Sequence, residues 1–86
     1  MKTTGEMEIF LKNVVWLRRH NGISKKRMAE LLGISTVSLN KIENGEMPKR
    51  LGVEIVFKIY DVFKILPKNQ FALELWNLNS DESIRK

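Results

Sequence analysis

The chain has 86 residues, with 15 lysines and arginines against 10 aspartates and glutamates, no cysteine and a net charge of +5. This length suits one domain, and the lack of cysteine excludes a disulfide framework and a thiolate metal site. No apolar run reaches the roughly 18–20 residues of a membrane span, and residues 1–20 are unlike a signal peptide, so we expect a cytoplasmic protein without membrane contact.

The excess positive charge lies in the first part of the chain. Residues 1–50 hold ten basic and five acidic residues, whereas residues 51–86 hold five of each. Five of the basic residues lie between Arg18 and Arg27, a stretch without an acidic residue. Such a surface is typical of proteins that bind a polyanion, most often a nucleic acid, and a solvated basic face is the alternative.

Residues 3–20 have the spacing of an amphipathic helix, and Thr3 with Glu6 is expected to form a capping box at its start. One apolar stripe recurs at three- and four-residue steps: Phe10, Val14 and Leu17. Three further apolar residues lie off this stripe: Leu11, Val15 and Trp16. The helix is therefore either buried on two sides or offers the second patch to a partner.

Two short helices joined by a glycine turn are predicted between Ser24 and Gly45. Ser24 and Ser35 are expected to cap the starts of helices at 25–32 and 36–44, and Gly33 and Gly45 to close their ends in a left-handed conformation. The residues expected to face inward are Met28, Ala29 and Leu32 in the first helix and Leu39 and Ile42 in the second.

A fourth helix is predicted from Gly52 or Val53 to Lys64. Its inward residues are expected to be Ile55, Val56, Ile59, Val62 and Phe63. Several of these are β-branched, which makes a strand the alternative, but their period of about 3.6 residues favours a helix. A fifth helix is expected to begin at Pro67, with inward residues at Phe71, Leu75 and Leu78.

Little in the sequence supports catalysis. His20 is the single histidine, and it has no carboxylate at a metal-ligand spacing. Three glutamates do not form a metal-binding pattern: Glu30, Glu43 and Glu46. We therefore expect a protein that is not an enzyme and that holds no metal and no cofactor.

The stretch from Ser24 to Gly45 has the design of a helix-turn-helix, in which the second helix fits the major groove. Over about residues 8–66 the chain resembles the Cro/phage-repressor-type, or XRE-like, helix-turn-helix family. The matching residues are Arg18, Gly22-Ile23-Ser24, Met28-Ala29, Leu32-Gly33-Ile34-Ser35, Ser38, Leu39, Ile42-Glu43-Asn44-Gly45 and Pro48. The resemblance implies an all-α, five-helix, lambda-repressor-like DNA-binding domain with the motif at its second and third helices. We expect this single domain to span residues 1–76, followed by a frayed polar C-terminal tail at 77–86.

The resemblance also implies roles for individual residues. The base-reading positions are Thr36, Val37, Asn40 and Lys41, with packing at the rim of the core as the alternative for Val37. The expected phosphate contacts come from Lys25, Lys26, Asn44, Lys49 and Arg50. Arg18 and Glu43 occupy positions of a largely buried structural ion pair. At the position of Lys25, many family members carry a glutamine, which can also brace a side chain of the recognition helix. The lysine in this chain puts that bracing in question.

These features together predict a sequence-specific regulator of transcription, with repression as the expected sign, that binds double-stranded DNA. Family members usually pair as homodimers on half-sites about 34 Å apart. The candidate dimer surfaces are the second patch of the first helix and the fifth helix with Trp76. The alternative is a small protein-interaction module, such as the antitoxin of a toxin–antitoxin pair, which would use the same patch to hold a protein partner.

Overall fold

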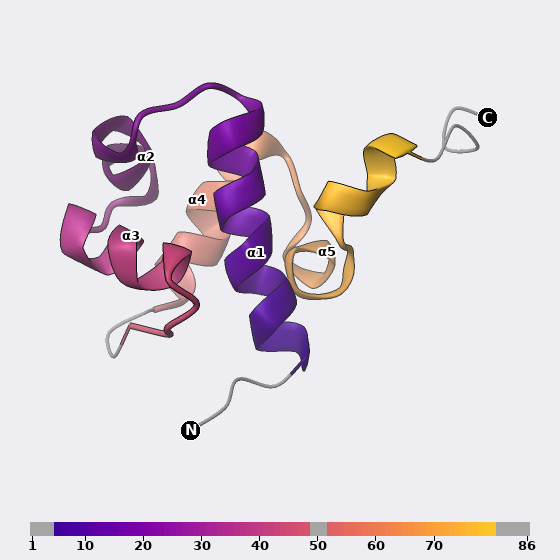
Figure 1. The fold of residues 1–86 in the computed structure, drawn as a ribbon. Helices are drawn as coiled ribbons and strands as arrows, with labels where there is room; N and C mark the ends of the chain where they lie inside the picture. Colours follow the sequence, from indigo (N-terminus) through magenta and orange to yellow (C-terminus); the bar gives the residue numbers. More distant parts are fainter. Residues whose placement is uncertain (1–4, 49–51, 81–86) are drawn as a thin grey trace.

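The computed structural model describes residues 5–48 and 52–80, which form helices joined by short turns and loops (Figure 1). The elements are α1 (Gly5–His20), α2 (Lys25–Leu32), α3 (Thr36–Glu43), α4 (Val53–Phe63), α5 (Pro67–Ala72) and a 3₁₀ helix, η1 (Leu75–Ser80). No strand occurs within these described ranges. The predicted all-α fold with five helices is therefore confirmed. Thr3, the proposed partner of Glu6 in a capping box, lies outside the described residues.

Helix α1 lies in the middle of the fold. It packs against α3 on one side and against α5 and η1 on the other, which places these elements to its left and right in Figure 1. Leu11 is consequently buried in the core, as the main stripe of α1 is, while Val15 and Trp16 stay half-buried. Leu11 is therefore buried within the domain and not available to a partner, whereas Val15 and Trp16 keep exposed surface on the second patch.

Helix α4 contributes fewer core residues than its apolar content predicts. Ile55 and Ile59 are buried, and Val56 and Phe63 pack partly against the core. The prediction for Val62 is wrong, because its side chain is 40% exposed. Successive residues of an α-helix are rotated by about 100°, so Val62 falls at the edge of the sector that carries Ile55 and Ile59.

The C-terminal part of the chain is not one continuous helix. Helix α5 ends at Ala72, and Leu75 is buried as expected but belongs to η1. Phe71 of α5 stacks on Phe10 of α1, with the ring centroids 4.5 Å apart. The segment expected to fray from Asn77 onward instead continues as η1 to Ser80, and residues 81–86 lie outside the described part, as does the side chain of Leu78.

A buried asparagine fastens this C-terminal part to α1. The Nδ2 group of Asn13 donates to the backbone oxygens of Gln70 and Leu73, each at 2.8 Å. Its Oδ1 accepts a hydrogen bond from the backbone N–H of Leu75 at 3.0 Å. The end of α5, the turn after it and the start of η1 leave backbone groups that no helix satisfies, and Asn13 satisfies three of them away from water.

Gln70 plays a matching part at the junction of α4 and α5. Its Nε2 donates to the backbone oxygens of Val56 and Ile65, each at 2.9 Å. These two bonds fix the position of α5 against the first part of α4 and against the segment that follows α4. Both Asn13 and Gln70 are at most 2% exposed, so the packing of the C-terminal elements depends on polar groups as well as on apolar ones.

Candidate nucleic-acid interface

The starts of α2 and α3 are fixed by serine caps. The Oγ of Ser24 accepts a hydrogen bond from the backbone N–H of Arg27 at 3.1 Å. The Oγ of Ser35 accepts one from the backbone N–H of Ser38 at 3.0 Å. Each bond satisfies a backbone donor that has no partner within its helix, and the predicted starts at Lys25 and Thr36 are confirmed.

The turn between the two helices depends on Gly33. This residue has φ of 72°, in the left-handed region where an L side chain is strained. Its N–H donates to the backbone oxygen of Glu30, and the N–H of Ile34 donates to that of Ala29 at 3.0 Å. These bonds close α2, so that α3 begins three residues later at a fixed angle to it.

The inner side of α3 is tied to α1 by an ion pair. The guanidinium of Arg18 contacts the Glu43 carboxylate twice, with Nε 2.5 Å from Oε2 and Nη2 3.2 Å from Oε1. A third group, Nη1 of Arg18, donates to the backbone oxygen of Ile23 at 3.0 Å. The Glu43 side chain is only 7% exposed, so this carboxylate holds α3 in place and is not directed at a ligand.

Lys25, at the start of α2, lies beside the same carboxylate. Its Nζ is 3.9 Å from Oε1 of Glu43, and half of its side chain is exposed. The distance is too long for a hydrogen bond, so the attraction is weak and leaves the ammonium donors available. At this position a weak charge contact thus joins the start of α2 to the end of α3.

The outer side of α3 carries the predicted base-reading residues. All four are exposed: Thr36, Val37, Asn40 and Lys41. Val37 is 63% exposed, so it does not pack at the rim of the core, the alternative considered for it. Within the described part of the chain, none of these four side chains has a hydrogen bond or an ion pair, and the face is available for contacts with another molecule.

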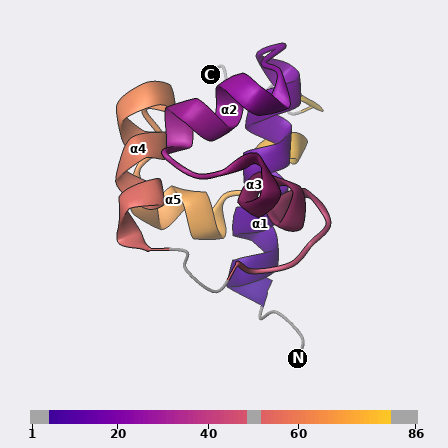
Figure 2. The same cartoon turned by 90° about the vertical axis from the view of Figure 1, so that its left-hand side faces the viewer.

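The predicted phosphate contacts are placed only in part. Lys26 is exposed in the first turn of α2, and Asn44 is exposed directly after the last residue of α3. Figure 2, which looks onto the side of the molecule where α2 and α3 lie, shows both helices in front of α1. Lys49 and Arg50 lie outside the described residues.

Comparison with known proteins agrees with this geometry. A helix-turn-helix family model matches residues 15–67, more than half of the chain. The chain belongs to the Cro/phage-repressor-type, XRE-like helix-turn-helix family. No curated protein and no solved structure gave a significant match. As a member of this family, the protein is a DNA-binding regulator of the XRE type.

Among residues 5–48 and 52–80, no three histidine, aspartate or glutamate side chains gather closely enough to bind a metal ion. None of the described helices combines the length and the hydropathy that crossing a bilayer requires.

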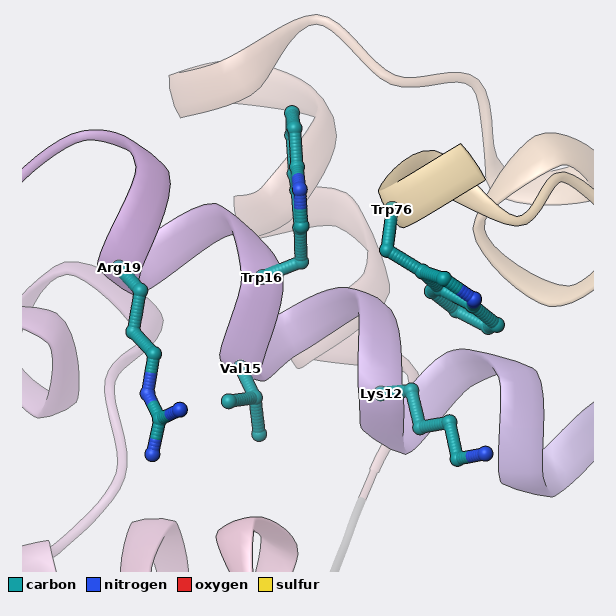
Figure 3. Close-up of a pocket in the computed structure, with 5 residues that line it drawn as sticks. All are labelled: Lys12, Val15, Trp16, Arg19 and Trp76. Carbon is teal, nitrogen blue, oxygen red and sulfur yellow. The ribbon is translucent and has the colours of Figure 1, made fainter. Parts of the chain in front are cut away.

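A hollow of about 340 Å³ is formed by side chains of α1 and η1 (Figure 3). It is lined by Lys12, Val15, Trp16, Arg19 and Trp76. These residues include the two tryptophans expected at a partner surface. Both rings already have neighbours: Trp16 stacks on His20 at 4.2 Å, and the Nζ of Lys12 lies 5.5 Å from the ring centre of Trp76.

Proposed function

We propose that the protein is a sequence-specific regulator of transcription that binds double-stranded DNA and reads the major groove with residues 36–44. The observation that carries this proposal is that α3 is fixed to the fold on one side and exposed on the other. Its inner side is held by the Arg18–Glu43 pair, and its outer side presents four exposed polar or small side chains without partners in the described structure. A helix of this kind fits the major groove, which is about 12 Å wide.

The outer side chains suit the edges of particular bases. Lys41 would donate to O6 and N7 of guanine, and the methyl groups of Thr36 and Val37 would contact the methyl group of thymine. Asn40 would pair with adenine or remain hydrated. Lys25, Lys26 and Asn44 would contact phosphates and set the register, since phosphate contacts position a protein and base contacts specify the sequence.

One such unit contacts only a few base pairs, so we propose that the protein acts as a homodimer on two half-sites about 34 Å apart. We propose that the protein acts as a repressor. A dimer that covers a promoter blocks transcription, and this mode of action needs no surface for recruiting the polymerase. Such a regulator would work in the cytoplasm beside the DNA it controls.

Binding to random duplex DNA at increasing salt tests this function. Because several cations would displace counterions from phosphates, the affinity is expected to fall steeply between about 50 and about 200 mM salt. Absence of binding at the low-salt end would contradict the proposal. It would favour the second candidate, a protein-interaction module such as an antitoxin, for which the hollow beside Trp16 and Trp76 is the supporting observation.

Replacing Lys25 with alanine is expected to weaken binding to all sequences alike. The slope of log affinity against log salt should fall in magnitude by about one, because one phosphate contact is lost. Salt-titrated fluorescence anisotropy measures the slope, and Lys68→Ala on α5 serves as a control that keeps it. An unchanged slope in the Lys25 variant would remove this residue from the phosphate contacts.

Replacing Lys41 with alanine is expected to relax base preference at one position of the site. The loss of discrimination should be about 1–3 kcal/mol there, since the donors that distinguish guanine disappear. Selection of duplexes from a random pool gives the consensus for each variant. If the alanine variant and the wild type select the same consensus, Lys41 does not read a base.

A further inference from the structure

An exposed apolar stripe runs along α4. Its members are Val53, Phe57 and Tyr60, which are 71%, 57% and 40% exposed. They follow one another at steps of four and three residues, so they lie on one face of the helix, away from the buried Ile55 and Ile59. Large apolar side chains gathered on one face, unlike scattered ones, mark a surface that another molecule covers.

The proposed DNA interface does not use this stripe. Helix α4 is joined to the rest of the fold through α2 and α5, and its stripe belongs to neither helix of the DNA-binding motif. Figure 2 shows α4 along the left-hand edge of the side that presents α2 and α3. A molecule that covers α4 from that edge would stand beside this side and leave it open.

The charges around the stripe are arranged so that the surface complements itself. Glu54 lies in the first turn of α4, and Lys64 follows its last residue, with Nζ 5.7 Å from the centre of the Tyr60 ring. Within the described residues, neither charge has a salt bridge. Along the sequence, the midpoint between Glu54 and Lys64 falls within half a residue of the midpoint between Phe57 and Tyr60. A single two-fold axis near that point would therefore pair Glu54 with Lys64 of a second copy, and Phe57 with Tyr60 of a second copy.

We propose that α4 packs antiparallel against α4 of a second copy of this chain. In that arrangement Phe57 contacts Tyr60 of the partner subunit, and Glu54 faces Lys64 of the partner subunit, each contact occurring twice. With Glu54 near one end of the stripe and Lys64 near the other, opposite charges face each other across an isologous antiparallel contact, and the exposed Lys58 and Asp61 lie between them on α4. A helix pair of this kind brings the axes to about 8–10 Å and removes the three apolar side chains from water.

This position agrees with binding to two half-sites. Figure 2 shows α4 at the edge of the side that carries α2 and α3, so a two-fold axis at α4 that runs along the line of sight of that view leaves both reading helices on the same side of the dimer. The inference names the surface of the proposed homodimer and rests on that proposal for its use on DNA. The association itself takes place without DNA, so a failure here is separate from a failure to bind duplexes.

Sedimentation velocity of the full chain without DNA, over a range of concentrations at low salt, tests the contact. The wild type is expected to sediment as a dimer, and Phe57→Ser to lower the affinity by about a hundredfold, because a central aromatic anchor is lost. Leu66→Ser is the matched control, since this residue is also exposed but lies outside the stripe. A wild type that stays monomeric at every concentration would overturn the proposal.

A charge exchange then identifies the second copy as the occupant. Glu54→Lys and Lys64→Glu alone should each weaken the dimer by about tenfold, because like charges then face each other twice. The double variant should return to within about threefold of the wild type. Circular dichroism verifies that each variant is folded. A double variant as weak as the single ones would show that these residues do not face each other, and the antiparallel contact would be wrong.

Discussion

Replacing Glu43 with alanine is expected to lower the free energy of unfolding by about 3–5 kcal/mol, the usual cost of leaving one partner of a largely buried ion pair alone. Arg18 would keep its guanidinium in a site where only 15% of the side chain is exposed, and α3 would lose its tie to α1. Urea denaturation followed by circular dichroism measures the change. Such a loss is a large part of the total stability of a small domain.

Two further variants separate this effect from a simple loss of charge. Glu30→Ala removes a carboxylate from an exposed pair with Arg27 and should cost at most about 1 kcal/mol. Arg18→Met combined with Glu43→Leu should recover most of the loss, since no unpaired charge remains buried. If Glu43→Ala costs no more than Glu30→Ala, the pair does not hold α3 in place.

Replacing Asn13 with leucine is expected to cost about 3 kcal/mol, although leucine has a similar volume. The substitution leaves two backbone oxygens and the N–H of Leu75 without partners in a buried site, and each unsatisfied group carries a desolvation penalty. Urea denaturation gives the total, and hydrogen exchange at the Leu75 amide reports whether η1 separates from α1.

The matched control for this prediction is Asn21→Leu. Asn21 also donates a side-chain hydrogen bond to a backbone oxygen, that of Leu17 at 2.8 Å, but it is exposed to water. Its replacement should cost about 1 kcal/mol or less, because the Leu17 oxygen keeps the hydrogen bond from the backbone N–H of Asn21 and water can take the place of the side chain. Equal losses at Asn13 and Asn21 would show that burial of the Asn13 network contributes nothing.

The helix-turn-helix could be predicted from the sequence because local residues determine it. Ser24 and Ser35 satisfy the first free N–H groups of each helix, and Gly33 takes the one backbone conformation that other residues avoid. These effects act over three or four residues and do not depend on the rest of the fold. The bounds of α2 therefore agree with the prediction at both ends.

The packing of the C-terminal elements could not be predicted in the same way. Asn13 lies three residues after Phe10 and four before Leu17, in register with the apolar stripe, and that position was the one signal in the sequence for its burial. Its partners are backbone groups more than 55 residues away, which appear only once α5 ends at Ala72. The exposed position of Val62 likewise depends on which sector of α4 meets its neighbours.

Some features of the candidate interface follow from the sequence, and others depend on how the helices cross or on the DNA. The exposure of the outer face of α3 follows from helical periodicity, because Leu39 and Ile42 must point inward. The contact between Lys25 and Glu43 depends on how α2 and α3 cross, which sequence spacing does not specify. Which bases the face selects depends on DNA, and the prediction rests on the chemistry of the side chains alone.

Selection of duplexes from a random pool by the wild-type protein is the decisive test of sequence reading by α3. We expect enrichment of a motif made of two inverted half-sites with centres about one helical turn, or about 34 Å, apart. Each half-site should contain a guanine and a thymine at fixed spacing, read by Lys41 and by the methyl groups of Thr36 and Val37. A pool that retains no motif after repeated rounds, although the protein is folded, would contradict it.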